Sequence, residues 1–375
     1  MKYQKLELHI SQVERLIAAS RSKFHNKNKA LIYANILKLF NGIKGSNYKS
    51  FNADELDYAR AALDIVFYSV EFLDYKTENQ IPKRLIFCLN KVINEWIDHG
   101  TDKYFIVVSY NNKSDDFHIR AMEQDIVFAA DQLFKTMFGV GYSQSLIQIS
   151  KPRYLFEDYL SSIPIYHEIG HFIEKNYQIA HALSREVTFP TLGISKIHFE
   201  EYFADIFAAQ YIGKSAIEPL NYISYHSMTT SNPTHPSNIA RQEVVNAFVD
   251  GTGTPNAMRI VNELKRVTLI RATRELKIRY KDLEEKENPF VNLCPRILKE
   301  PEKLHTLFLA GWQNWLDPLS KVRSEYSDHL ECSMMINKLI RNTIKLTMQN
   351  NESRKLKKIG NYFETVATKY GLLKN

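Results

Sequence analysis

The sequence predicts an α+β protein that is mostly helical and has a small sheet near the middle of the chain. Apolar residues recur at helical spacing in the first hundred positions and in the last third, while short β-branched and aromatic segments lie between them. Gly and Pro are scarce, so long disordered segments are not expected. We therefore expect an N-terminal helical region at 1–102, a core with the sheet at 103–250, and a C-terminal helical accessory region at 251–375.

Two helices of the N-terminal region follow from local patterns. Asn52 is followed three residues later by Glu55, which is the pattern of a capping box, and apolar residues then recur at helical spacing from Leu56 to Leu73. The segment 81–100 repeats this spacing and ends at Gly100, a typical C-terminal stop.

The middle of the chain contains the expected strands. "KYFIVVSY" at 103–110 and "FHIRA" at 117–121 flank a turn-rich segment, and together they predict a β-hairpin. A helix is expected from about Glu123 to Phe138, and "SLIQIS" at 145–150 predicts a further strand.

Helices are expected again after these strands. Pro164 suits the first turn of a helix that starts near Ile163 and carries "IYHEIGHFIEK", and a second helix is expected from about His198 to Ile212, before Gly213. From about Pro255 onward, four candidate helices are expected, with loops around 288–301 and 349–353.

The "HEIGH" segment predicts a metal site. His167 and His171 are four residues apart, so a helix places both imidazoles on one face, where they can bind one ion. Glu168 lies about 100° around the helix from His167, where it can reach a water molecule on a bound Zn²⁺ and act as its base. An amphipathic helix that contains two histidines by chance is the alternative.

A metal site needs a third ligand, and the sequence narrows the choice. Glu174 and Tyr177 stand where an HExxHxxGxxH site would need glycine and histidine, so that class is excluded. "EEYFAD" offers Glu201 as the ligand, and Asp205, one helical turn later, can accept the outer N–H of a ligating histidine. Glu200 is the neighbouring alternative, but no acidic residue follows it four positions later.

The loop "NPTHPSNIAR" offers a group for charge stabilisation. His235 can hydrogen-bond the oxyanion that develops during acyl transfer, and His226 competes for this role. Arg241 can steady the loop or bind a carboxylate.

HEIGH, ExxAD and THP with a downstream arginine together resemble the gluzincin zinc metallopeptidases. Small soluble bacterial peptidases of the Lit phage-exclusion type and of the ImmA/IrrE type are the most similar members, and membrane CAAX-type endopeptidases share the motif order. The resemblance covers about residues 103–245 and implies a minimal gluzincin core, a small sheet with the active-site helices. It implies that His167, His171 and Glu201 bind zinc and that Glu168 is the base. It also implies that Asp205 is the aspartate behind the ligands and that His235 is the histidine of the loop.

The expected function is therefore that of a zinc-dependent endopeptidase that cuts a protein substrate in the cytoplasm, with a selective role in regulation or phage defence. The alternative is an inactive peptidase-fold binding protein with structural zinc. Three widely spaced cysteines favour a reducing compartment, and no segment is apolar enough to cross a membrane. Nucleic acid is not the expected partner despite a net charge of +7, because the basic residues of 265–281 spread around their expected helix and an acidic run follows. The oligomeric state is left open.

Overall fold

The computed structural model describes residues 3–20, 27–74, 83–97, 104–111, 118–121, 124–141, 145–152, 158–185, 194–217, 231, 233–300 and 302–369. The chain folds into two compact units. The N-terminal unit comprises Met1–Ile81 and Asn90–Phe156, and the motif unit comprises Pro82–Leu89 and Glu157–Asn375.

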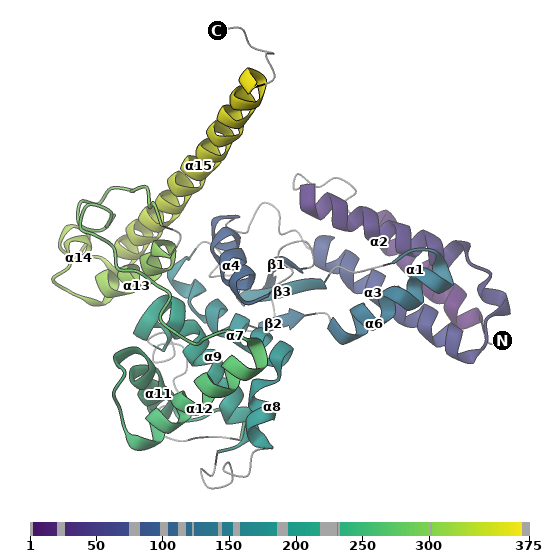
Figure 1. Ribbon diagram of the computed structural model, residues 1–375, viewed down its shortest axis with the longest axis horizontal. Helices are drawn as coiled ribbons and strands as arrows, with labels where there is room; N and C mark the ends of the chain where they lie inside the picture. Colours follow the sequence, from purple (N-terminus) through teal and green to yellow (C-terminus); the bar gives the residue numbers. More distant parts are fainter. Residues whose placement is uncertain are drawn as a thin grey trace. The chain divides into compact units, whose positions relative to one another are not determined.

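Helices packed side by side form most of the N-terminal unit (Figure 1). They are α1 (Gln4–Ala19), α2 (Lys27–Gly45), α3 (Ala53–Asp74) and α6 (Gln124–Phe138), and α4 (Lys83–Trp96) continues into the unit from the motif unit. The apolar faces of α1, α2, α3 and α6 bury one core that includes Leu6, Ile36, Leu63 and Phe134. The amphipathic spacing of the sequence accounts for this packing, because each helix hides a single apolar face.

The start of α3 confirms the predicted capping box. The backbone N–H of Asn52 donates to Glu55 Oε2 at 2.8 Å, and the N–H of Glu55 donates to Asn52 Oδ1 at 2.9 Å. Two N–H groups that the helix itself cannot satisfy thus receive partners.

A three-stranded sheet completes the N-terminal unit, in the order β1-β3-β2. Strand β1 (Tyr104–Asn111) pairs in parallel with β3 (Ser145–Pro152), and β2 (His118–Ala121) pairs antiparallel with β3. The predicted hairpin is wrong, since β3 lies between the two strands that were expected to pair. Strand β3 takes the centre because Ile147 and Ile149 are fully buried there, and a buried strand needs partners on both edges.

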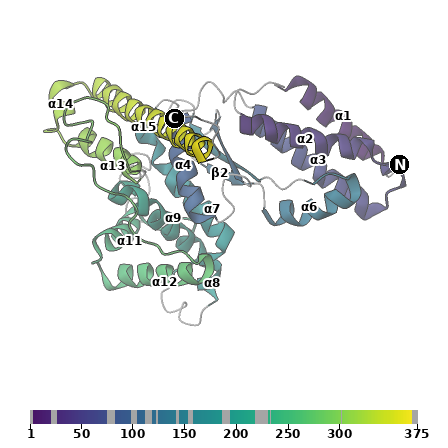
Figure 2. The same cartoon turned by 45° about the horizontal axis from the view of Figure 1, so that its top comes forward.

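Within the residues that the structure describes, the regular elements of the motif unit are all helices (Figure 2), and residues 273–300 form neither helix nor strand. They are α7 (Pro164–Tyr177), α8 (Ile179–Ser184), α9 (Lys196–Ile212), α11 (Asn238–Asp250), α12 (Pro255–Ala272), α13 (Lys303–Leu316), α14 (Lys321–Glu325) and α15 (His329–Lys369). The short 3₁₀ helices η3 (Leu160–Ser162) and η5 (Gly213–Ala216) precede α7 and follow α9.

The expected α+β core is therefore corrected to a predominantly helical fold. The described part of the unit that carries HEIGH contains no strand, and the sheet belongs to the N-terminal unit. Helices α13 and α15, which the sequence places in an accessory region, share a unit with α7 and α9. The physical reason is that α9 is buried from Glu201 to Ile212, and the elements that cover it are the helices α7, α8, α11 and α13.

The C-terminal third differs from the prediction in two places. Helix α15 continues without a break through 349–353, where a loop was expected. Helix α12 ends at Ala272, so the basic residues after it do not lie on one helix. The chain instead docks on α9, where the N–H groups of Arg279 and Tyr280 donate to the carbonyl of Gln210 at 2.7 and 3.2 Å.

In the part of the chain that the structure describes, no helix is both long and apolar enough to span a bilayer.

Candidate metal centre

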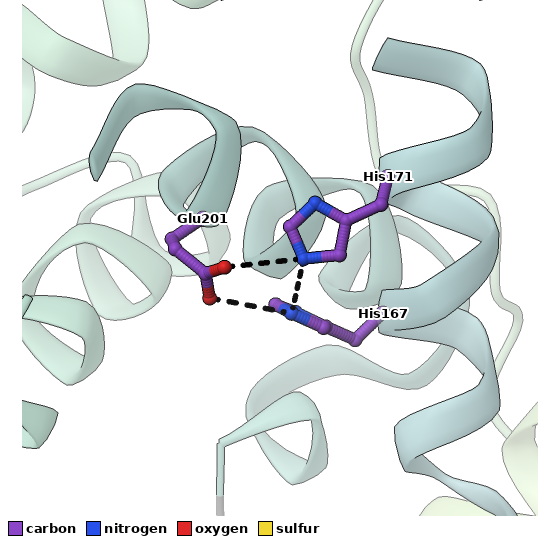
Figure 3. Close-up of side chains that lie close together, drawn as sticks. All are labelled: His167, His171 and Glu201. Carbon is purple, nitrogen blue, oxygen red and sulfur yellow. Dashed lines mark hydrogen bonds and ion pairs between the residues drawn. The ribbon is translucent and has the colours of Figure 1, made fainter. Parts of the chain in front are cut away.

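Helix α7 presents the two histidines of HEIGH from one face. It begins at Pro164, as predicted, because proline lacks the N–H that a first turn leaves unpaired. It ends at Gln178, whose left-handed conformation (φ 53°) lets its N–H donate to the carbonyl of Glu174 at 2.6 Å. Between these ends, His167 and His171 lie on the face that looks toward α9 (Figure 3).

Helix α9 carries the acidic partners within an almost fully buried segment. The hydroxyl of Ser195 caps its start by accepting a hydrogen bond from the N–H of His198 at 3.2 Å, and Gly213 ends it with a positive φ of 58°. Glu201 and Asp205 are buried on this helix, with 6% and 1% of their surface exposed. Carboxylates at such depth need cationic or hydrogen-bonding partners.

The two helices approach each other closely at a glycine. A Cβ atom on Gly170 would lie 2.7 Å from the Cα atom of Ala204, which is too close for any real side chain. Because Gly170 precedes His171 and Ala204 follows Glu201 by three residues, this contact brings the histidines and the carboxylate within reach of each other.

His167, His171 and Glu201 form one group whose ligand atoms all lie within 4.8 Å of one another. The two Nε2 atoms are 2.9 Å apart, His171 Nε2 lies 3.3 Å from Glu201 Oε1, and His167 Nε2 lies 3.5 Å from Glu201 Oε2 (Figure 3). These residues could hold a metal ion.

The donor set fits a small cation better than it fits a hydrogen-bond network. Glu201 Oε2 is buried and lies 3.5 Å from His167 Nε2 and 3.6 Å from Arg241 Nη2, too far from either for a strong hydrogen bond. Ligands that share a tetrahedral ion at ~2.0 Å are ~3.3 Å apart, close to the separations of these donors. A bound ion would therefore satisfy the buried oxygen with little movement.

Asp205 and Arg241 form a buried ion pair behind His167. The guanidinium Nε and Nη2 of Arg241 each donate to Asp205 at 2.7 Å, in a two-pronged arrangement. Asp205 Oδ1 also lies 2.9 Å from His167 Nδ1. This contact favours a proton on Nδ1, which leaves the lone pair of Nε2 directed at the metal position.

These carboxylates control the protonation of the site. Burial alone would lower the pKa of His167, but Asp205 and Glu201 outweigh it and raise that pKa to about 10. Burial likewise works against ionisation of Glu201 and Asp205. His167 and His171 nevertheless hold the pKa of Glu201 below its usual range, and Arg241 and His167 do the same for the pKa of Asp205. In the metal-free protein, His167 is therefore protonated on both ring nitrogens at neutral pH, and a metal must displace the proton on Nε2.

The other predicted residues occupy different positions around this group. Glu168 is partly exposed on α7. His235 is exposed, and its Nε2 atom lies 3.7 Å from Glu201 Oε1 while its Nδ1 atom is hydrogen-bonded to the Thr234 hydroxyl at 2.8 Å. Glu200, the alternative ligand, pairs instead with Lys196 at 3.3 Å. His226 lies outside the residues that the structure describes.

One buried polar contact beside the site was not predicted from the sequence. Tyr166 Oη and Nδ1 of His305, on α13, share a hydrogen bond of 2.9 Å. Their 139-residue separation leaves no local pattern that could have predicted it. The pairing of Arg241 with Asp205 was foreseen only as the binding of an unspecified carboxylate.

Comparisons with protein-family models, with curated proteins and with solved structures find no match for this chain.

Proposed function

We propose that this protein is a zinc-dependent endopeptidase that hydrolyses a peptide bond in an intracellular protein. The observation that carries the proposal is the group of His167, His171 and Glu201, with Glu168 beside the first histidine. Two imidazoles and a carboxylate are the ligand set of many catalytic zinc sites, which keep a fourth position for water or substrate.

Zinc is the metal that these ligands favour. Imidazole nitrogen suits zinc better than magnesium or calcium, which prefer oxygen ligands. When bound, zinc supplies Lewis acidity and lowers the pKa of a water ligand towards ~7. His171 is partly exposed, with 28% of its side chain accessible, so the ligand group is open to solvent on one side. A structural zinc site would normally be closed by a fourth protein ligand.

Glu168 is the proposed general base. It follows His167 on α7, so its carboxylate projects from the helix about 100° away from the ligand face. From there it can accept a proton from the attacking water without occupying a ligand position, and can later deliver that proton to the leaving amine. Its partly exposed position is compatible with contact to water and substrate.

His235 is the proposed oxyanion stabiliser. Its imidazole lies at the exposed edge of the site, with Nε2 near Glu201, in a loop that leads directly into α11. A donor placed there can hydrogen-bond the oxygen that gains charge as the carbonyl is attacked, a contribution that is often the largest single one in acyl transfer. The Thr234 hydroxyl at 2.8 Å steadies the imidazole through Nδ1.

A selective role in regulation or defence is proposed from the size and chemistry of the chain. The N-terminal unit has its own helical core and sheet, so it can recognise a partner while the motif unit cuts. Cys88, Cys294 and Cys332 are not joined in disulfide bonds, as suits a reducing compartment. The motif resemblance to Lit-type and ImmA/IrrE-type peptidases supports the same class of intracellular target.

The first test compares the purified protein with its Glu168→Gln variant. We expect both to bind one zinc per chain and only the wild type to hydrolyse an unstructured protein or a peptide library. Equal activity of the two proteins would remove Glu168 from the mechanism. Zinc binding without activity in either protein, with a target supplied, would favour a structural site, for example one that His235 closes as a fourth ligand.

The second test identifies the substrate. Cells that express wild type or Glu168→Gln are compared by mass spectrometry of protein N-termini. One new terminus, found only with the wild type, is the expected outcome for a selective peptidase. Many scattered termini would indicate general degradation and contradict the selective role.

A further inference from the structure

Tyr166, the residue before the first histidine of HEIGH, is fully buried where α7 packs against α9, and its side chain reaches α13. Its ring packs against Tyr211 of α9 and against Phe308 of α13, with ring centroids 6.2 and 6.0 Å away. Its hydroxyl shares a 2.9 Å hydrogen bond with Nδ1 of His305, which is only 2% exposed. Helix α7 thus has a polar contact to α13 at the position directly before His167.

The position of the histidines depends on how α7 is rotated about its own axis. An imidazole nitrogen lies on the order of 6 Å from the axis of its helix, so a rotation of about 10° moves it by about 1 Å. Metal–ligand distances tolerate only about 0.2 Å. Correct placement of both Nε2 atoms therefore requires α7 to be fixed to within a few degrees.

Apolar packing restricts this rotation without a directional contact. Gly170 and Ala204 set how near the helices lie, and Ile165, Ile169 and Ile173 of α7 are buried as well, but apolar packing is non-directional. Tyr166 adds a hydrogen bond, which depends on distance and angle. Its hydroxyl is at the far end of a long rigid ring, where a small rotation of α7 would lengthen the bond to His305 the most.

Helix α13 is a fixed point for this bond because it is anchored at both ends. The Lys303 ammonium, two residues before His305, donates to Glu287 at 2.7 Å and is buried. Further along the helix, Trp312 Nε1 donates to the carbonyl of Leu160, just before α7, at 3.1 Å. Helix α13 also packs against α15 and α9, so the His305 imidazole is held by contacts other than those with α7.

We propose that His305 is a positioning residue for the metal centre, acting through Tyr166 to hold α7 at the rotation that places His167 and His171 against Glu201. The inference rests on the proposed metal site but not on the reaction that the site performs. It makes α13 part of the metal centre, although α13 contributes no ligand to the group.

The test measures metal binding in three variants: Tyr166→Phe, His305→Phe and the two combined. Zinc affinity is measured by competition with a chelator, and the visible spectrum of the Co²⁺-loaded protein reports ligand geometry. We expect each single variant to lose zinc affinity on the order of tenfold, the range found for residues behind metal ligands. The double variant should lose no more than either single one, because both changes remove one hydrogen bond. The Co²⁺ band should change shape in all three.

Two controls separate positioning from stability. Tyr33→Phe removes a comparable hydroxyl contact, the 2.8 Å one to Ser20 in the N-terminal unit, and should leave affinity and Co²⁺ spectrum unchanged. His305→Asn keeps a polar atom near the Nδ1 position and should restore most of the affinity lost in His305→Phe. It also provides the answer should His305→Phe fail to fold.

Wild-type affinity and spectrum in Tyr166→Phe would overturn the proposal, as would failure of His305→Asn to improve on His305→Phe. The measured quantity is metal binding. A protein that binds zinc but cleaves nothing would therefore contradict the proposed peptidase function, and its zinc affinity would still test the role of His305.

Discussion

A Cβ atom placed on Gly170 of α7 would meet the backbone of Ala204 on α9, 2.7 Å from its Cα atom and 3.0 Å from its carbonyl oxygen. Backbone atoms cannot rotate away as a side chain can, so only glycine allows the two helices this spacing. Gly170 of HEIGH is therefore required for the close approach of α7 and α9, and this approach brings His167 and His171 within reach of Glu201.

We predict that Gly170→Ala weakens both the fold and the metal site. Alanine favours a helix by about 1 kcal/mol over glycine, but the clash with Ala204 costs about 1–3 kcal/mol and moves α9 away from the histidines. Thermal unfolding and zinc competition should both report a loss. Gly45→Ala at the end of α2, where no atom lies within 4 Å of the added Cβ, is the matched control and should leave zinc affinity unchanged without lowering stability. Unchanged zinc affinity in Gly170→Ala would contradict the close-approach argument.

Replacement of neighbouring glutamates should separate the ligand from its sequence alternative. Glu201→Gln is expected to lose zinc affinity on the order of a hundredfold or more, because an amide is a poor zinc ligand. Glu200→Gln removes only a partly exposed ion pair with Lys196 and should leave affinity within about twofold. Equal effects of the two variants, measured by chelator competition, would refute the assignment of Glu201.

Substitutions of Arg241 and Asp205, the buried ion pair, should have strongly non-additive effects on the free energy of unfolding. Arg241→Leu leaves Asp205 buried without its main partner, which costs about 3–5 kcal/mol of unfolding free energy. Arg241→Lys keeps the charge but loses the two-pronged geometry, so it should retain only part of this stability. The double variant Arg241→Leu/Asp205→Leu should be less destabilised than the two single losses added together. Additive losses in urea unfolding would show that the pair does not interact as the distances indicate.

Metal binding should release a proton at neutral pH. His167 ordinarily titrates near pH 6.5, but in the metal-free protein its pKa is raised to about 10. Between these values the metal must displace a proton from His167, so apparent zinc affinity should rise about tenfold per pH unit from about pH 7 to 9. Calorimetry in buffers of different ionisation enthalpy should count about one proton per zinc from this residue. An affinity that is flat above pH 7.5 would rule out the raised pKa.

The same shift predicts how stability changes with pH in the metal-free protein. A pKa raised by folding contributes stability that is complete below pH 6.5 and is lost as the pH rises through about 10. Zinc-loaded protein, in which His167 has already given up its proton, should lack this decline. Urea unfolding at pH 7 and pH 9.5, with and without zinc, measures the difference.

The local parts of the fold and site were predictable because short sequence spacing determines them. The capping box of Asn52 and Glu55, the start of α7 at Pro164 and the shared face of His167 and His171 each follow from residues within one helical turn. The choice of Glu201 needed one further step, the four-residue spacing to Asp205 on an apolar helix.

The rest depends on contacts between residues far apart in sequence, which no local pattern reveals. Strand β3 inserts between β1 and β2 because its isoleucines are buried, whereas the turn residues between those two strands suggested a hairpin. Helix α12 ends at Ala272, where Thr273 takes a left-handed conformation, and the segment after it binds Gln210 of α9 through its backbone. Likewise, Tyr166 gave no sign in the sequence that His305 would be its partner.

The hydrogen bonds that anchor the start of α7 also govern when the site can form during synthesis. The N–H of Tyr159 donates to the side chain of Asn337, which lies 178 residues later in the chain, and Trp312 bonds the carbonyl of Leu160. A nascent chain that has emerged only as far as α12 carries every candidate metal ligand but lacks these anchors. We therefore expect ribosome-bound chains that expose residues up to 300 to bind zinc weakly, and longer ones that expose Asn337 to bind it tightly. The metal centre would thus form late in synthesis, only after Trp312 and Asn337 have emerged.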